Sequence, residues 1–191
     1  MEKMGQIEVI CGPMFAGKTE ELIRRANRLQ YAKKKYLVFK PTIDDRYSTT
    51  EIVSHSNYRK NSIAIKKSSE ILNYITDDIQ AVIIDEVQFI DENVINVAEW
   101  LANKGLRVIC GGLDCDFKGN PFKIVAELLA RAESVTKLNA ICNVCGQPAT
   151  RTQRIIDGHP AYDDDPIILV GATEAYEPRC RKCHMVLKRD K

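Results

Sequence analysis

The sequence lacks an excess of charge of either sign. Its 28 Lys and Arg residues nearly balance its 26 Asp and Glu residues, which leaves a formal net charge of +2. A general polyanion binder needs a strongly basic face, so this balance argues against a nucleic-acid partner. Long apolar runs are also lacking. The first residues, MEKMGQIEVICG, contain none long enough for a signal peptide, and no segment approaches the ~20 apolar residues of a membrane span. We therefore expect a cytoplasmic protein with no membrane partner.

Length and composition are those of an ordinary globular protein. Apolar residues make up 45% of the 191 residues and charged residues 28%, which are usual values. This length suits one domain with an appendage, or two small domains. Seven cysteines are present, and in a reducing compartment such residues are thiols or metal ligands rather than disulfides.

Short apolar segments alternate along the chain with amphipathic ones. Val- and Ile-rich stretches that end near Gly, Pro or an acidic residue predict strands at Gln6–Cys11, Tyr36–Lys40, Ala81–Asp85 and Leu106–Gly111. Helical spacing and capping signals predict helices at Glu20–Lys34, at Glu92–Lys104 with Asp91 as N-cap, and at Pro121–Glu133 with Asn120 as N-cap. This alternation predicts an α/β fold, with a parallel sheet covered by helices on both faces.

Two stretches depart from this alternation. Asp44–Ser62 is polar without clear periodicity, and we expect a loop there. After about residue 138, Ala149–Ile156 and Pro166–Val170 resemble strands of a small separate sheet. Asp157-Gly158 is a turn signal between them, but the intervening Pro160–Asp165 argues against a tight two-residue hairpin.

The segment GPMFAGKT matches the phosphate-loop pattern G-x-x-x-x-G-K-[ST], with a predicted strand before it and a predicted helix after it. Backbone N–H groups of such a loop converge on phosphate, and glycine permits the close approach. Lys18 would reach the β- and γ-phosphates, and the Thr19 hydroxyl would ligate Mg²⁺. The alternative is a strand-to-helix turn whose Lys and Thr face solvent. The predicted loop comprises Gly12, Pro13, Met14, Phe15, Ala16, Gly17, Lys18 and Thr19.

A second acidic element follows the strand predicted at Ala81–Asp85. Asp85 and Glu86 emerge at its carboxyl end, where ligands bind in open parallel sheets. Asp85 suits Mg²⁺, which keeps most of its hydration shell and uses few carboxylates. Glu86 is then free either to polarise water for ATP hydrolysis or to take a proton from an acceptor hydroxyl. Two solvated acids at a strand end are the alternative.

The cysteines include two C-x₂-C pairs, Cys142 with Cys145 and Cys180 with Cys183. This is the spacing of a Cys₄ structural zinc site, and two pairs in a cytosolic chain favour metal over a redox role. The 34 residues between the pairs form a long loop. Closing it costs an extra ~3 kcal/mol, well below the ~10–16 kcal/mol that zinc supplies in model peptides.

The chain resembles the cytosolic-type thymidine kinases, which combine a phosphate-loop core with a zinc-bound lasso. The matching segments are spread over nearly the whole chain: GPMFAGKT, DDRYS, IDEVQF, GLDCDFKGNPF, VTKLNAICNVCG, ATRTQR and VGATEAYEPRCRKC. The resemblance implies a RecA-like α/β core over residues 1–138 and a zinc-binding lasso domain over 139–191. It also implies a homotetramer, feedback inhibition by dTTP, and transfer of the ATP γ-phosphate to the 5′-hydroxyl of thymidine.

The resemblance assigns roles to residues at matching positions. Glu86 would accept the proton, and Lys18 and Arg46 would act on the transferring phosphoryl group. Around ATP and Mg²⁺ it places, besides the phosphate loop, Asp44, Asp85, Glu86, Val87 and Gln88. The thymidine site would be formed by Met14, Phe89, Phe117, Phe122 and Tyr176, with the backbone of Leu169, Val170 and Gly171 on the thymine edge.

Residue patterns alone leave alternatives open for this site. Phe89 and Phe122 suit either a flat base or the protein core, and a loop arginine such as Arg46 is usually solvated. Rival functions are another phosphate-loop nucleoside or nucleotide kinase, and a nucleic-acid-stimulated ATPase with a DNA-binding zinc ribbon. If zinc only orders the lasso, its removal should weaken thymidine binding and spare ATP binding.

Overall fold

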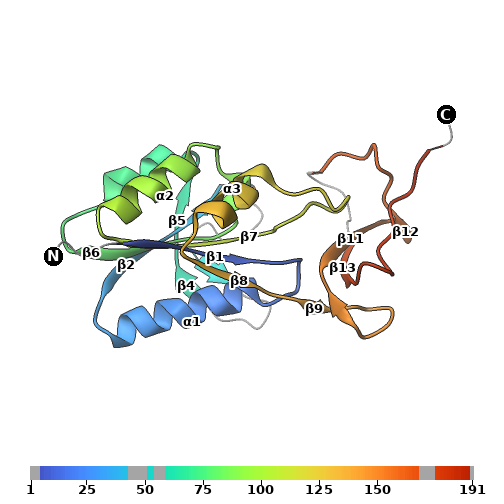
Figure 1. The fold of residues 1–191 in the computed structure, drawn as a ribbon, viewed down its shortest axis with the longest axis horizontal. Helices are drawn as coiled ribbons and strands as arrows, with labels where there is room; N and C mark the ends of the chain where they lie inside the picture. The colour runs from blue at the N-terminus through green and yellow to red at the C-terminus, as the bar shows by residue number, and fades with distance from the viewer. Residues whose placement is uncertain (1–4, 43–50, 54–58, 168–174, 190–191) are drawn as a thin grey trace.

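The computed structural model describes residues 5–42, 51–53, 59–167 and 175–189. Figure 1 shows a central sheet with helices on both faces, and a smaller β-rich part beyond the carboxyl ends of its strands. The chain begins at the opposite end of the molecule from this smaller part. The predicted α/β fold with a parallel sheet is therefore confirmed.

The central sheet has six strands in the order β5-β2-β6-β7-β1-β8, and every neighbouring pair is parallel. The four predicted strands are confirmed with bounds shifted by up to two residues, and the two edge strands were missed. The strands are β1 (Gln6–Cys11), β2 (Lys35–Pro41), β5 (Ile63–Ile65), β6 (Ile79–Ile84), β7 (Arg107–Gly112) and β8 (Ser134–Lys137).

Side chains of the inner strands alternate between two apolar layers. In β6, Val82 and Ile84 pack in the layer of α2 (Val94–Asn103) and α3 (Lys123–Arg131), whereas Ala81 and Ile83 pack in the layer of α1 (Lys18–Tyr31). Continuous apolar strands are typical of parallel sheets, because both faces are covered. Full burial of each Ile or Val contributes about 1.5–3 kcal/mol, so these layers fix where the strand ends lie.

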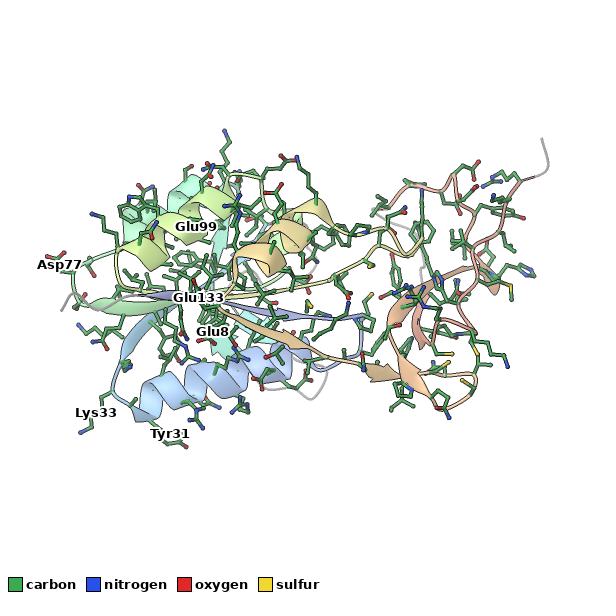
Figure 2. All side chains as sticks on the ribbon, viewed as in Figure 1. Glu8, Tyr31, Lys33, Asp77, Glu99 and Glu133 are labelled. Carbon is green, nitrogen blue, oxygen red and sulfur yellow. The ribbon has the colours of Figure 1, made fainter. Side chains whose placement is uncertain are left out.

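One charged residue interrupts the α1 layer. Glu8 of β1 is buried and points toward α1 (Figure 2), where it forms ion pairs with Arg25 and Arg107. Arg25 also donates a 2.8 Å hydrogen bond to the Thr136 hydroxyl of β8. The network therefore ties strands β1, β7 and β8 to α1.

The helix starts differ from the sequence prediction. Asp91 does not cap α2, because its carboxylate accepts hydrogen bonds from the Ser68 amide (2.6 Å) and hydroxyl (2.8 Å) at the start of a 3₁₀ helix, η1 (Ser68–Tyr74). Asn120 does not cap α3, because the helix begins at Lys123 with Phe122 at its N-cap, and the Asn120 amide donates to the Asp116 carboxylate at 2.9 Å. Asp91 and Asp116 thus accept hydrogen bonds from groups outside α2 and α3. Asp side chains commonly bind such local backbone groups instead of capping a helix.

The smaller β-rich part contains a two-stranded and a three-stranded antiparallel sheet. We call the segment from residue 139 onward the ribbon. Its strands are β9 (Ala140–Ile141), β10 (Pro148–Ala149), β11 (Arg151–Ile156), β12 (His159–Pro160) and β13 (Ala175–Arg179).

One prediction for the ribbon was wrong, and a second is only partly covered by the described residues. Asp157 and Gly158, with φ of 49° and 81°, join β11 to β12 as a tight two-residue hairpin. Positive φ at both central residues is the condition for this turn, and Asp-Gly satisfies it. The strand predicted from Pro166 is absent at residues 166 and 167, and its remainder lies outside the described residues.

The segment predicted as a loop, Asp44–Ser62, contains a short antiparallel pair, β3 (Glu51–Val53) with β4 (Arg59–Asn61). Ser62, the other described residue of this segment, lies outside the pair. None of the helices in the described part of the chain combines the length and apolarity that crossing a lipid bilayer requires.

Candidate active site and metal centre

The predicted phosphate loop lies between the end of β1 and the start of α1. Gly12, Phe15 and Gly17 have positive φ values of 145°, 64° and 82°. At Gly12 a Cβ atom would stand 2.3 Å from the Leu138 carbonyl oxygen, so only glycine fits. The loop therefore has the tight, glycine-dependent path that brings backbone N–H groups together at a helix start.

Lys18 is the first residue of α1 and is buried at the loop. Its ammonium group donates a 2.8 Å hydrogen bond to the Pro13 carbonyl. Burial lowers the pKa of Lys18, although the nearby carboxylates of Glu86, Asp85 and Asp114 act in the opposite direction. A cation thus lies folded over the loop, where it would meet nucleotide phosphates.

Asp85 and Glu86 follow β6 directly, as predicted. The Asp85 carboxylate accepts a 2.9 Å hydrogen bond from the Glu86 amide, and the Asp85 amide donates to the Phe39 carbonyl of β2 at 2.9 Å. Burial and the Glu86 charge raise the pKa of Asp85 to about 7. A buried carboxylate beside a second one suits a divalent cation, so Asp85 fits the role of Mg²⁺ partner.

Glu86 has a left-handed backbone, with φ of 50° and ψ of 41°. This conformation is uncommon for a residue with a side chain, and such strain is held by surrounding contacts. One of these contacts comes from Gln88, whose Nε2 donates to the Glu86 carboxylate while its Oε1 accepts from the Leu113 amide at 3.1 Å. Gln88 therefore links the end of β6 to the end of β7.

Val87 and Gln88, predicted among the ATP and Mg²⁺ residues, thus have described contacts of a different kind. The Val87 side chain is fully buried in the apolar layer of α2 and α3. The Gln88 amide is engaged by Glu86 and Leu113. Both residues hold the Asp85-Glu86 turn in place.

The predicted aromatic residues fall into two groups. Phe89 and Phe122 make an edge-to-face pair with ring centroids 6.0 Å apart. Phe117 is buried, and the Arg154 guanidinium lies 5.2 Å from its ring centroid. Tyr176 of β13 stands opposite Arg154 in the β11–β13 register. Phe89 follows the carboxyl end of β6, Phe117 and Phe122 lie between β7 and α3, and Tyr176 belongs to the ribbon.

Five predicted site residues lie outside the described part of the chain: Asp44, Arg46, Leu169, Val170 and Gly171. Three further residues were not predicted from the sequence. Asp114, two residues beyond β7, is buried with its carboxylate 2.9 Å from the Lys137 ammonium group. The rule that found Asp85, an acid after a buried strand, could also have found Asp114. Thr152 and Arg154, buried polar residues of β11, lie within the matching segment ATRTQR, but the sequence analysis assigned them no role.

The two C-x₂-C pairs converge in the ribbon. The sulfur atoms of Cys142, Cys145, Cys180 and Cys183 all lie within 4.8 Å of one another. Tetrahedral zinc, with Zn–S bonds of about 2.3 Å, needs sulfur separations of about 3.8 Å, and Cys145 and Cys180 are already 3.6 Å apart. Among the described residues this is the one such cluster, and it could hold a structural zinc ion.

Local backbone geometry prepares the thiols for metal. Burial opposes ionisation of Cys142, but hydrogen bonds from the backbone of Cys180, Val144 and Cys145 lower its pKa to about 6. Hydrogen bonding to Cys180 and Cys145 raises the pKa of Cys183 to about 12. Metal ligands must be deprotonated, so a zinc ion would take the place of these shared protons. His184 is not part of the cluster, because its Nε2 hydrogen bonds with the Phe117 carbonyl at 2.8 Å.

The comparison with protein families agrees with this arrangement of strand ends, phosphate loop and cysteine cluster. The family model described as Thymidine kinase matches residues 5–184, which is nearly the whole chain. The chain belongs to the thymidine kinase family and is a phosphotransferase of that kind.

Proposed function

We propose that the protein transfers the γ-phosphate of ATP to the 5′-hydroxyl of thymidine, giving dTMP. The observation that carries this proposal is the meeting of the Gly12–Thr19 loop, which follows β1, with Asp85 and Glu86, which follow β6, in a chain of the thymidine kinase family. Lys18 of the loop lies close enough to feel the charge of both carboxylates. A phosphate site with a carboxylate close to it provides the parts that phosphoryl transfer to a hydroxyl requires.

Glu86 is the proposed proton acceptor. Its carboxylate is fixed by Gln88, and its strained backbone turns it away from the line of β6. A base must hold its oxygen within hydrogen-bond reach of the acceptor hydroxyl, and a fixed carboxylate lowers the entropic cost of that alignment. Asp85, buried behind it, is left for the cation.

Lys18 is proposed to bind the β- and γ-phosphates and to neutralise charge as the phosphoryl group moves. Thr19 and Asp85 would hold Mg²⁺, which supplies further neutralisation of the phosphate oxygens. Asp44 and Arg46 are proposed to complete this region. All of these groups act by position and charge, which is how most of the barrier to phosphoryl transfer is lowered.

The thymidine side of the site is proposed to include Met14, Phe89, Phe117, Phe122 and Tyr176, with the backbone of residues 169–171 reading the base. Zinc in the Cys₄ cluster would be structural. The division into residues 1–138 and 139–191, a homotetramer, a cytoplasmic location and feedback inhibition by dTTP stay predictions. Each follows from the family resemblance or composition.

The test is a nucleoside panel with purified protein, ATP and Mg²⁺. Thymidine should be phosphorylated much faster than the nucleosides of cytosine, adenine or guanine, and mass spectrometry should identify dTMP. Single-stranded DNA should leave ATP turnover unchanged. ATP hydrolysis stimulated by DNA, with no nucleoside product, would instead establish the ATPase alternative.

A further inference from the structure

We propose that the ribbon, cross-linked by its cysteine cluster, holds the phosphate loop in its nucleotide-binding shape, with Thr152 and Ala16 as the positioning residues. The proposal rests on the proposed function only in taking Gly12–Thr19 as the nucleotide-binding loop. It assigns the metal site a role toward the nucleotide, in addition to any role toward the nucleoside.

The first contact is a hydrogen bond between the two parts. The Met14 amide donates to the Thr152 hydroxyl at 3.0 Å, between residues 138 positions apart in the chain. Thr152 is only 5% exposed. In β11 it lies opposite Pro178 of β13, two residues before Cys180. Thr152 is therefore carried by β11, and β11 pairs with the strand, β13, that leads directly into the second cysteine pair.

The second contact is apolar. The Ala16 side chain packs against a small cluster of Ala140, Cys142 and Ala149, against which Cys180 and Cys183 also pack. Three of these residues are members of the candidate zinc site. A methyl group of the phosphate loop thus lies against the packing that surrounds the sulfur atoms.

The third contact is the connection between the two parts. The Leu138 amide donates to the Cys11 carbonyl at 2.8 Å, just before the loop, and the Leu138 carbonyl occupies the space where Gly12 has no side chain. Two residues later the chain enters β9 of the ribbon. The loop is in this way contacted at its beginning by Leu138, at Met14 by Thr152, and at Ala16 by the cluster around Cys142.

These contacts matter because the conformation of the loop includes a strained residue, which costs free energy. Phosphate binding requires converged N–H groups, and the path that converges them includes Phe15 at a φ of 64°. A non-glycine residue in this region is strained and relaxes when its surroundings loosen. The ribbon supplies surroundings that the loop's own strand and helix do not.

This inference revises the expectation that metal removal would spare ATP binding. That expectation treated the phosphate loop and the cysteine cluster as independent. Ala16 and Thr152 connect them, so loosening the ribbon should weaken nucleotide binding as well as thymidine binding.

The test compares Thr152→Val, which keeps the shape and removes the hydroxyl, with Thr152→Ser, which restores it. Thr150→Val is the matched control, because it removes a hydroxyl two residues away on the same segment. ATP affinity would be measured by calorimetry, zinc content by mass spectrometry, and amide hydrogen exchange over residues 12–17 without nucleotide. We expect Thr152→Val to bind ATP about 2- to 12-fold more weakly, the range for one lost hydrogen bond. The amide hydrogens of residues 12–17 should also exchange faster in this variant, and its zinc content should be unchanged.

Thr152→Ser and Thr150→Val should behave as the unsubstituted protein. Wild-type affinity and exchange in Thr152→Val would overturn the positioning role. In a second arm, zinc is removed by a chelator and then returned as Zn²⁺ alone. Loop exchange should rise and ATP affinity fall on removal, and both should recover on return. Metal-free protein that keeps its central sheet and binds ATP as before would overturn the proposal.

These outcomes separate the inference from the proposed function. If the unsubstituted protein binds ATP without phosphorylating thymidine, the proposed function fails and the affinity measurements still decide the inference. If it binds no nucleotide at all, the proposed function fails, and the hydrogen-exchange comparison decides whether the ribbon supports the loop.

Discussion

Strands β6 and β11 are both buried, but their interiors are opposite in kind. In β6, the four residues Ala81–Ile84 are apolar and at most 1% exposed. In β11, the three consecutive residues Thr152, Gln153 and Arg154 are polar and at most 5% exposed. The central sheet is thus stabilised by apolar burial, whereas the ribbon is held by directional contacts.

The polar interior of β11 depends on partners from elsewhere in the chain. The Gln153 amide donates to the Met185 carbonyl and accepts from the Met185 amide, both at 2.8 Å. Arg154 donates to the Pro166 carbonyl and stacks on Phe117. Buried polar groups are costly whenever a partner moves away. Such an interior is therefore stable only if its surrounding segments are fixed, and one of them, at Met185, begins two residues after the last cysteine of the cluster.

The largest expected effect comes from removing the metal. Structural zinc supplies on the order of 10–16 kcal/mol in peptides, so chelation should release the ribbon and leave the sheet folded. Hydrogen exchange measured by mass spectrometry should show lost protection in β11 and β13, with β1, β6 and β7 still protected. Simultaneous loss of protection in the ribbon and in the central sheet would show that the two parts unfold as one cooperative unit. It would contradict the proposed difference between their interiors.

The next effect concerns chemistry rather than stability. Glu86→Gln should lower kcat by roughly 10²–10⁴-fold, because it removes a proton acceptor and keeps the shape. ATP affinity and zinc content should be unchanged. The matched control is Glu92→Gln, an exposed carboxylate paired with Lys123 at 2.9 Å, which should keep full activity. A kcat within about threefold of the unsubstituted enzyme would exclude Glu86 as the base.

Apolar truncation should distinguish the two interiors directly. Ile84→Ala, at a fully buried position of β6, should lower the free energy of unfolding by about 2–5 kcal/mol. Ile141→Ala is the control in the ribbon, where the side chain is 66% exposed, and should change it by less than about 0.5 kcal/mol. Urea denaturation of the zinc-loaded protein measures both. Equal losses would mean that the ribbon, too, depends on apolar burial.

The smallest effect tests the polar exception within the central sheet. Burial alone would raise the pKa of Glu8, but Arg107, Gln6 and Arg25 together lower it below its ordinary value of 4.5. A lowered folded-state pKa stabilises the protein above that ordinary value, and the stabilisation is lost as the pH falls through the folded-state value. Glu8→Gln should therefore cost about 1.5–3 kcal/mol near neutral pH, the range for hydrogen bonds to charged groups.

The same measurement at acidic pH supplies the contrast. Below the ordinary pKa of 4.5 the difference between Glu8→Gln and the unsubstituted protein should begin to shrink, because Glu8 then takes up a proton in the unfolded chain. The difference should be smallest below the lowered folded-state pKa, where both side chains are neutral in the folded protein. Unfolding curves at several pH values would show it. A difference that stays constant on acidification would mean that Glu8 acts by packing and not by charge.

The sequence was sufficient for the parts of the fold that depend on repeated apolar positions. β1, β2, β6 and β7 are each long enough to show a buried pattern, and their ends placed the phosphate loop and Asp85 correctly at one edge of the sheet. The edge strands β5 and β8 are shorter or half solvated, so no such pattern marks them. The cysteine spacing predicted the cluster, because a metal site constrains local sequence strongly.

Sequence reasoning failed where one polar side chain had several possible partners. Asp91 could serve a helix start or a turn, and tertiary contact with Ser68 decides the choice. The contacts of the Gln88 amide with Glu86 and Leu113 likewise could not be read from the sequence, and its predicted role toward the nucleotide stays a prediction. Thr152 and Arg154 are buried by residues distant in sequence, which no local pattern records. The site's charged groups were therefore predictable, and the contacts that hold them were not.

The hydrogen bond between Met14 and Thr152 also has a consequence for biosynthesis. Its partners are 138 residues apart, so a nascent chain emerges with its complete phosphate loop long before the ribbon can contact it. Chains are made from the N-terminus at about 5–20 residues per second, and the central sheet can form as it emerges. Nucleotide-binding competence would then be acquired only after the second cysteine pair has been synthesised.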